Sequence, residues 1–181
     1  MIILIVCIIF VILFGILFFN QVIREENSIK NAYATIDVLL KKRYDLIPNL
    51  VEVVKGSATH ELEVFSKITQ IRTEALKNLK NDEVAIKTDT EFTSEMKNLF
   101  AVAEQYPNLK SNTSYLELQK NLLAIENELS AARRTYNAAV TEFNITLESF
   151  PTNLIGKMMH KNKKALFTVN ENIRETIKIS Y

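Results

Sequence analysis

One short stretch of the sequence has residue types that could do metal chemistry. His60 and Glu61 begin the run HELEV, which matches the first half of the H-E-x-x-H motif of zinc proteases. In that motif two imidazoles one helical turn apart hold the zinc ion, and the glutamate acts as general base. Here Val64 stands in place of the second histidine, and the other histidine, His160, lies far along the chain. The sequence therefore predicts no zinc site of this type, and Glu61 is interpreted as an exposed carboxylate in the first turn of a helix.

The composition gives little support to other enzyme chemistry. Three glycines in 181 residues are too few and too scattered to build a phosphate-binding loop. No cysteine or serine has a positioned base that would make it a nucleophile. The single cysteine, Cys7, cannot form an internal disulfide. We therefore predict a protein that is not an enzyme and that binds no cofactor or metal.

Charge and residue content indicate a helical domain. The formal net charge is +1, so no global attraction to nucleic acid is expected. Turn formers are scarce, with three glycines and three prolines, and 48% of the residues are hydrophobic. A chain of 181 residues is long enough for one domain with a core. These features predict one mostly helical domain.

Residues 1–19 carry no charged and no strongly polar side chain. As a helix they would be about 28 Å long, close to the ~30 Å thickness of the hydrocarbon layer of a membrane. A cleaved signal peptide would have a basic start, a shorter apolar run and a small-residue cleavage site, which this stretch lacks. It is therefore predicted to be a transmembrane signal anchor, with span residues including Ile2, Ile5, Ile9, Leu13 and Phe18.

Basic residues near this anchor predict which side of the membrane the rest of the chain occupies. None precedes the anchor, whereas Arg24 and Lys30 follow it closely and three more lie at residues 41–43. Lys and Arg favour the cytoplasmic side of a membrane-spanning helix. A short N-terminus outside and a cytoplasmic helical domain are therefore expected.

The run KKRYDLIPNLVEVVKG, residues 41–56, interrupts a helical pattern that continues from the anchor. A proline inside a helix costs about 3 kcal/mol, but the cost largely disappears in a first turn. If Asp45 capped a new helix, Pro48 would lie in such a first turn. These two residues therefore predict a kink or a restart where the helix changes direction, and Gly56 predicts the end of the second piece.

Three further helices are predicted from the spacing of apolar residues, over residues 59–79, 89–106 and 114–150. The last begins with a capping box and follows coiled-coil spacing until Pro151. Residues 20–56 and 114–150 would each be about 55 Å long as helices, while the two between them would be about 32 and 27 Å. The pattern thus has two long and two shorter helices.

Short connections make consecutive helices antiparallel neighbours. The predicted fold is therefore all-α, an N-terminal transmembrane helix followed by an antiparallel up-down helical bundle with two long and two shorter helices. The predicted parts are the anchor at 1–19, the bundle at 20–151 and a basic amphipathic C-terminal segment at 152–181. Within the bundle, residues 20–44 and 130–150 would form a two-helix stalk near the membrane, and residues 45–129 a four-helix head.

The predicted stalk has apolar residues without a third helix of the same chain to cover them. Exposed apolar surface favours a partner by about 25 cal/mol per Å². We therefore expect self-association through the stalk and the anchor. The alternative is that lipid headgroups and lysine side chains cover the same surface. The predicted stalk interface consists of Ile29, Tyr33, Ile36, Tyr136, Phe143 and Leu147.

Basic and apolar residues are interleaved in LIGKMMHKNKKALF, residues 154–167. A basic side chain near anionic lipid can gain up to about 1 kcal/mol while its apolar neighbours insert. The alternative is a solvated loop whose apolar residues pack on the bundle. The residues predicted to contact the membrane surface are Lys157, Met158, Met159, Lys161, Lys163 and Lys164.

Two groups of basic residues lie on predicted helices. Arg133 and Arg134 are expected to pair with acidic residues such as Asp37 on the facing helix. Binding of a partner or an anionic ligand is the alternative. The basic residues at 41–43 are interpreted as solvated charges at a helix end rather than as a lipid or nucleic-acid site.

Three blocks of the sequence follow one another after the N-terminal span: NAYATIDVLLKKRYDLIPNLVEVVKGSATHE at 31–61, LFAVAEQYPNLKSN at 99–112, and ENELSAARRTYNAAVTEFN at 126–144 with Phe150 and Pro151 after it. In this order the three blocks resemble bacterial LemA proteins. The resemblance implies a membrane-anchored, mostly helical bundle in the cytoplasm, held by a single pass through the bacterial inner membrane. It implies no established biochemical activity. The acidic C-terminal segment common in the family is reduced here to Glu171 and Glu175.

The residues and the resemblance together predict a non-enzymatic structural protein of the membrane. It would self-associate through its coiled-coil-like helices and would organise or shape the membrane. Its partners would be the lipid bilayer, further copies of itself or another membrane protein, and not nucleic acid. The alternative is a cytoplasmic adaptor or sensor for a membrane protease or envelope-stress protein, which would use the exposed face of the head.

Overall fold

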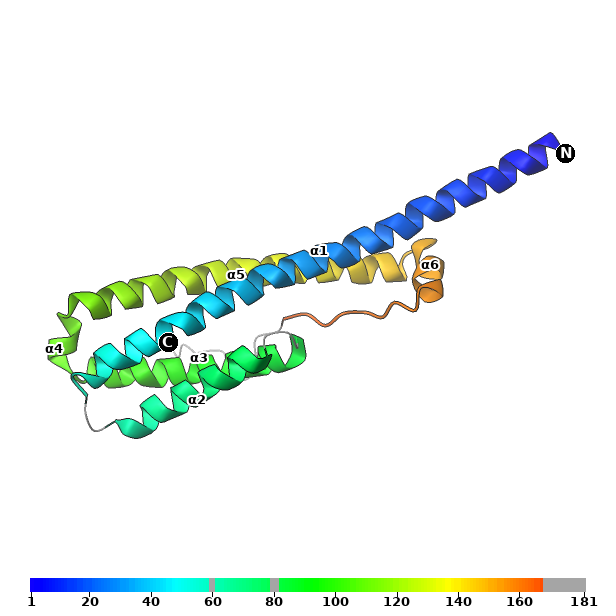
Figure 1. The fold of residues 1–181 in the computed structure, drawn as a ribbon. Helices are drawn as coiled ribbons and strands as arrows, with labels where there is room; N and C mark the ends of the chain where they lie inside the picture. The colour runs from blue at the N-terminus through cyan, green and yellow to red at the C-terminus, as the bar shows by residue number, and fades with distance from the viewer. Residues whose placement is uncertain (59–60, 79–81, 168–181) are drawn as a thin grey trace, which may run out of the picture. The chain divides into compact units, whose positions relative to one another are not determined.

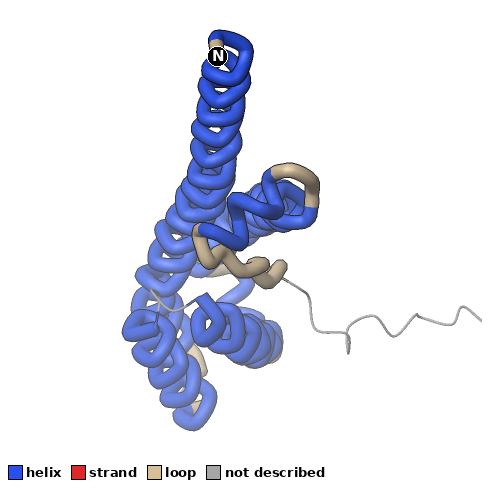
Figure 2. Tube along the Cα trace, turned by 90° about the vertical axis from the view of Figure 1, so that its right-hand side faces the viewer, coloured by secondary structure: helices blue, strands red, loops and turns tan. Residues whose placement is uncertain are grey.

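The computed structural model describes residues 1–58, 61–78 and 82–167, and over these residues it contains helices and no strand (Figures 1 and 2). The predicted all-α class, with two long and two shorter helices after an apolar N-terminus, is confirmed. Two very short helices, α4 and α6, were not predicted. The helices are α1 (Ile2–Lys55), α2 (Leu62–Asn78), α3 (Asp82–Glu104), α4 (Pro107–Lys110), α5 (Thr113–Glu148) and α6 (Thr152–Met158).

The chain forms two compact units, and α1 and α5 contribute to both. The first unit combines Met1–Ala32 with the chain from Arg133 onward. It therefore contains the apolar start of α1, the end of α5, and α6. The second unit is Tyr33–Ala132 and contains the rest of α1 and α5 together with α2, α3 and α4.

The core of the second unit forms from apolar side chains at helical spacing on each helix. Tyr44 of α1 and Phe92 of α3 lie edge to face, with ring centroids 4.7 Å apart, and both are almost fully buried. Such an aromatic pair adds about 0.5–1.5 kcal/mol beyond the apolar area that it buries. The other fully buried large side chains of this unit are Ile36, Ile47, Leu50, Val54, Ile68, Leu99, Leu109 and Leu129.

Helix α1 continues through Pro48 without a break and ends at Lys55, just before Gly56. The predicted end at Gly56 is therefore confirmed, but the predicted restart at Asp45 is wrong. Asp45 does not cap a helix, because it lies inside α1 and accepts a 2.6 Å hydrogen bond from Lys41, one turn earlier. A bend of the helix axis at Pro48 stays a prediction.

Pro48 leaves a backbone acceptor open on α1. Proline has no N–H, so the carbonyl of Tyr44, four residues earlier, lacks its usual helical donor. Arg72 of α2 donates its Nε–H to this carbonyl at 2.7 Å. The proline that interrupts the hydrogen-bond ladder of α1 thus provides the acceptor that fastens α2 to α1.

We expect Pro48→Ala and Arg72→Met to be energetically coupled. Arg72→Met alone leaves the Tyr44 carbonyl without its donor, which costs about 1–3 kcal/mol in the free energy of unfolding. In the Pro48→Ala background the restored N–H bonds to that carbonyl, so the same substitution costs less. Urea unfolding of the four proteins in detergent should give a coupling of about 1 kcal/mol.

The matched control for this coupling is Lys77→Met, which removes an exposed basic residue of the same helix α2. Its effect should add to that of Pro48→Ala within about 0.5 kcal/mol. Additive effects for Arg72→Met as well would show that the proline and the arginine act independently.

Candidate functional site

The N-terminal part of α1 is an apolar surface that the rest of the protein does not cover. An 18-residue window there has a mean hydropathy of 3.6 and none of it is buried, so α1 is long and apolar enough to cross a membrane. Of the predicted span residues, Ile2, Ile5, Ile9 and Leu13 are at least half exposed. Phe18 is half-buried, and its ring centroid lies 5.7 Å from that of Phe14. This uncovered helix supports membrane anchoring.

Most residues of the predicted stalk interface are buried within a single chain. Ile29, Tyr136 and Phe143 in the first unit and Ile36 in the second are at most 5% exposed. Tyr33 and Leu147 are half-buried. The premise that this apolar stripe is left uncovered is therefore wrong for four of the six residues. Self-association itself stays a prediction, but these buried side chains do not provide its surface.

In the first unit, α6 packs closely on the end of α5 and covers part of it. A Cβ atom at Gly156 would lie 2.6 Å from Leu147 Cδ2, so a larger residue there would require the Leu147 side chain to move. The Thr152 hydroxyl shares its one hydrogen between the backbone carbonyls of Thr146 and Ser149. The turn between α5 and α6 is thus fixed by side-chain-to-backbone bonds and by a glycine contact.

Residues 161–167, which we call the strap, lie along α5 in an extended conformation without secondary structure (Figure 1). Asn144 and Asn137 of α5 each bond to the backbone of one strap residue, Lys164 and Phe167 respectively. The Phe167 ring lies edge to face with Tyr136 at 5.1 Å between centroids. Sequence reasoning missed this arrangement, because an extended segment has no helical periodicity and the asparagines lie 20 and 30 residues from the groups they bind.

Two of the lysines predicted to contact the membrane surface have acidic partners on the protein. Lys161 Nζ lies 2.8 and 2.9 Å from the two carboxylate oxygens of Glu26, and Lys163 pairs with Glu148. The hydrogen bond from Lys161 lowers the pKa of Glu26 below its ordinary value, against the opposing effect of burial. Contact of these two lysines with lipid would compete with the two ion pairs.

The other residues of that prediction lie around α6. Lys157 and Met158 are exposed, Met159 is half-buried, and the Lys164 side chain is exposed while its N–H bonds to Asn144. Leu154 and Met158 are neighbours one turn apart on α6 and are 53% and 76% exposed. Phe150, just before α6, is 82% exposed. We call Phe150, Leu154 and Met158 the apolar foot; its contact with a membrane stays a prediction.

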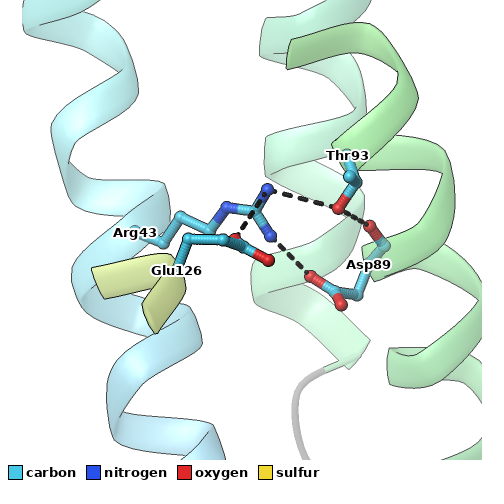
Figure 3. Close-up of polar contacts among 4 residues, drawn as sticks. All are labelled: Arg43, Asp89, Thr93 and Glu126. Carbon is cyan, nitrogen blue, oxygen red and sulfur yellow. Dashed lines mark hydrogen bonds and ion pairs between the residues drawn. The ribbon is translucent and has the colours of Figure 1, made fainter. Parts of the chain in front are cut away.

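Arg43 is the centre of a buried polar cluster in the second unit (Figure 3). Its Nη1 donates to Asp89 Oδ1 at 3.1 Å and its Nη2 donates to Thr93 Oγ1 at 3.2 Å, both on α3. Nη2 also lies 3.3 Å from Glu126 Oε2 on α5. The guanidinium carbon is 5.0 Å from the centroid of the Phe92 ring. One side chain of α1 thereby joins α3 and α5.

This cluster corrects two interpretations made from the sequence. Arg43 is only 5% exposed, so it is not a solvated charge at a helix end. Asp89 lies inside α3 and not at its start, and it is 7% exposed. The burial of Arg43 could have been predicted from the sequence, because Arg43 falls on a core position of the alternating four- and three-residue spacing of α1. That series is Ile36, Leu40, Arg43, Ile47, Leu50 and Val54.

A cavity of about 690 Å³ adjoins Arg43 between α1, α3 and α5 of the second unit. Its lining is mainly apolar, with Met96, Phe100 and Leu123 among the residues, and it includes the charged side chains of Lys97 and Lys120. The guanidinium donors that border it already bond to protein oxygens. The cluster therefore joins α1 to α3 and α5 by polar contacts.

No group of three His, Cys, Asp or Glu residues that could hold a metal ion occurs in the part of the chain that the structure describes. His60 of the HELEV run, and Glu171 and Glu175 of the C-terminal segment, lie outside the described residues. Glu61 is half-buried and immediately precedes α2, so it is less exposed than expected. The pairing of Arg133 and Arg134 with Asp37 stays a prediction.

These features define an all-α protein with an apolar N-terminal helix, long enough to cross a membrane, that continues into a helical bundle. The chain belongs to the LemA family, whose model matches residues 32–181. The family resemblance of the three sequence blocks is thereby confirmed.

Several curated proteins are similar to this chain. Protein LemA of Metamycoplasma hominis is 29% identical over 172 residues, which cover 90% of this chain and 77% of that protein. The magnetosome proteins MamQ 1 and MamQ 2 of Paramagnetospirillum magneticum are each 23% identical over 162 residues, or 76% of this chain. The aligned region spans 60% of each of these two MamQ proteins.

We expect Arg43→Met to destabilise the protein by about 3–5 kcal/mol, because it removes the guanidinium that pairs with the buried Asp89 carboxylate. Lys42→Met is the matched control, since Lys42 is the neighbouring basic residue on α1 and is exposed. Its effect on the free energy of unfolding should stay within about 0.5 kcal/mol. Denaturant titration in detergent measures both. Equal effects of the two substitutions would mean that the Arg43 cluster does not hold the bundle together.

The Glu26–Lys161 pair should make attachment of the strap sensitive to acid. The folded-state pKa of Glu26 lies below its value in the unfolded chain. The pair therefore contributes its full stability above the unfolded value of about 4.3, and this contribution is lost as the pH falls through the folded value. Lys161→Gln should raise the pKa of Glu26, measured by carboxyl ¹³C NMR titration.

The control for this titration is Lys163→Gln, because Lys163 pairs with Glu148 and not with Glu26. It should leave the pKa of Glu26 unchanged. A Glu26 carboxylate that titrates alike in the wild type and in Lys161→Gln would contradict the ion pair.

Proposed function

We propose that this protein is a non-enzymatic structural protein, anchored by one pass in a bacterial inner membrane, that self-associates and organises or shapes the bilayer. The observation that carries the proposal is the pair of uncovered apolar surfaces in the first unit. One is the N-terminal part of α1, and the other is the apolar foot beside α6. The similarity to LemA and MamQ proteins supports a membrane-associated helical protein.

The position of the foot along the first unit supports contact with the same membrane. Lys161, which follows the foot by three residues, bonds to Glu26 of α1. Glu26 comes seven residues after Phe19, the end of the apolar stretch, which is about 10 Å along a helix. A foot held near that level would place Phe150, Leu154 and Met158 at the membrane interface with Lys157 beside them. Wedging of such side chains into one leaflet is the means by which the protein would shape the bilayer.

Orientation and self-association rest on different features. The basic residues after the anchor support a short N-terminus outside and the bundle in the cytoplasm. The surface for self-association is the anchor, because the predicted stalk residues are largely buried. A Cβ atom at Gly15 would meet nothing within 4 Å, so the backbone of α1 is accessible there to another helix.

A second candidate function is an adaptor that presents the second unit to another membrane protein, such as a membrane protease or envelope-stress protein. The cavity beside Arg43 favours it, because that cavity is mainly apolar and borders the exposed side chains of Leu116 and Leu123. Such a surface could accept an apolar side chain of a partner.

Electron microscopy of the full chain in liposomes tests the two candidates. We expect the wild type to form regular assemblies and to deform the vesicles. Phe150→Ser combined with Leu154→Ser removes most of the foot's apolar surface, so this variant should assemble without deforming the vesicles. Leu116→Ser combined with Leu123→Ser is the matched control in the second unit and should behave as the wild type.

Isolated copies on undisturbed vesicles would contradict the structural function and would favour the adaptor. Assemblies that deform vesicles equally with and without the foot would retain self-association but would remove the foot from the mechanism.

A further inference from the structure

The strap is held at two places by the same interaction, in which an asparagine side chain forms hydrogen bonds with main-chain atoms. Asn144 donates its Nδ2–H to the carbonyl of Lys164 and accepts the Lys164 N–H on Oδ1, both at 2.9 Å. Asn137 does the same with Phe167, at 2.9 and 2.8 Å. Each side-chain amide thus satisfies both backbone groups of one strap residue, as a neighbouring β-strand would. We call this pair of asparagines the clamp.

The two asparagines can bind two strap residues because their spacing along the helix matches the spacing of those residues along the extended strap. Asn137 and Asn144 are seven residues apart, which is two helical turns or about 10.5 Å. Lys164 and Phe167 are three residues apart, which is about 10 Å in an extended chain. An α-helix with asparagines at this spacing therefore binds an extended peptide at every third residue, whatever the side chains between them. Ala165 and Leu166 between the clamped residues are exposed.

Selectivity comes from the two ends of the strap. At one end the Lys161 ammonium bonds to the Glu26 carboxylate. At the other end the Phe167 ring packs on the Tyr136 ring. The site therefore fits an extended peptide with a lysine and, six residues later, an aromatic residue. The occupant defined by these contacts is the strap itself, which every copy of the chain carries.

The connection to the strap passes through a single unfavourable backbone conformation. His160, between α6 and the strap, has φ of 51°, the only positive φ of a non-glycine residue in the described chain. This left-handed conformation is costly for a residue with a side chain. The Lys161 N–H bonds to the Gly156 carbonyl of α6 at 3.0 Å, so a change at His160 would redirect the strap at the loss of this one hydrogen bond at the end of α6. His160 is the type of hinge at which identical segments exchange between protomers.

We propose that the clamp of one copy binds the strap of a second copy, so that exchanged straps link neighbouring copies in the membrane. The inference rests on the proposed self-association. The same hydrogen bonds, ion pair and ring contact form in both arrangements, so exchange costs little in contacts. Anchoring in one membrane raises the effective concentration of neighbouring straps.

The test uses two full-length chains that each carry one new cysteine and Cys7→Ser. Thr141→Cys places a thiol on α5 between the two asparagines, and Ala165→Cys places one on the strap between the two clamped residues; both positions are exposed. The two chains carry tags of different size, are reconstituted together in liposomes and are treated with a short bismaleimide. A covalent product that contains both chains can form only between copies.

We expect this mixed product, and we expect its yield to fall about tenfold or more when Asn137→Leu and Asn144→Leu are added to the Thr141→Cys chain, since four hydrogen bonds are lost. Leu123→Cys, an exposed position in the second unit, replaces Thr141→Cys as the control for random collision. If the leucine variants do not fold, Asn137→Asp and Asn144→Asp remove the donors and retain the shape.

A chain with both Thr141→Cys and Ala165→Cys reports whether the strap stays on its own α5. Internal cross-linking of this chain, without the mixed product, would overturn the exchange. Analytical ultracentrifugation of the same samples in detergent separates the two proposals. Oligomers with internal cross-links overturn the exchange alone, whereas monomers overturn both the exchange and the proposed self-association.

Discussion

A buried guanidinium needs partners for its donors, and this requirement organises the second unit. Arg43 lies among apolar residues of α1, and its charge is compensated by Asp89 of α3 and Glu126 of α5. At the next residue, Tyr44, the carbonyl that Pro48 leaves open accepts a hydrogen bond from Arg72 of α2. Each of the three helices α2, α3 and α5 is therefore fastened to the same short stretch of α1 by a polar contact. Apolar packing then surrounds these contacts.

The first unit relies on the same kind of contact, a polar side chain that binds main-chain atoms of another segment. Asn137 and Asn144 hold the strap in this way, and Thr152 holds the turn between α5 and α6. The chain is poor in glycine and proline and has long helices joined by short connections. Side chains that bond to main-chain groups can attach an irregular segment where no second strand is present to pair with it. The result in this unit is a covered α5, whose stalk residues become core.

The sequence predicted the helices well because their apolar residues repeat at a helical period, and it predicted the uncovered apolar start of α1 because that stretch has no charge over a membrane's thickness. The prediction from sequence was wrong where the type of a residue suggested one environment and its position in the helical spacing suggested another. Arg43 was interpreted by its type as solvated, although its place in the heptad spacing predicted burial. The apolar spacing predicts a helix that begins at Asp89, but Asp89 lies inside α3 and its partner lies 46 residues away. The strap could not be predicted, since its conformation depends on groups of α5 and has no period of its own.

The buried ionic cluster selects the register in which the helices pack, which apolar packing alone would not do. Helices with heptad-like apolar spacing, such as α1 and α5, can pack in registers that differ by seven residues at little cost in apolar contact. A slipped register would bury the Arg43 charge without Asp89 and Glu126, and an unpaired buried charge costs several kcal/mol. The cluster therefore penalises wrong registers far more than it stabilises the right one. A single register keeps the exposed residues of α3 and α5 in constant positions.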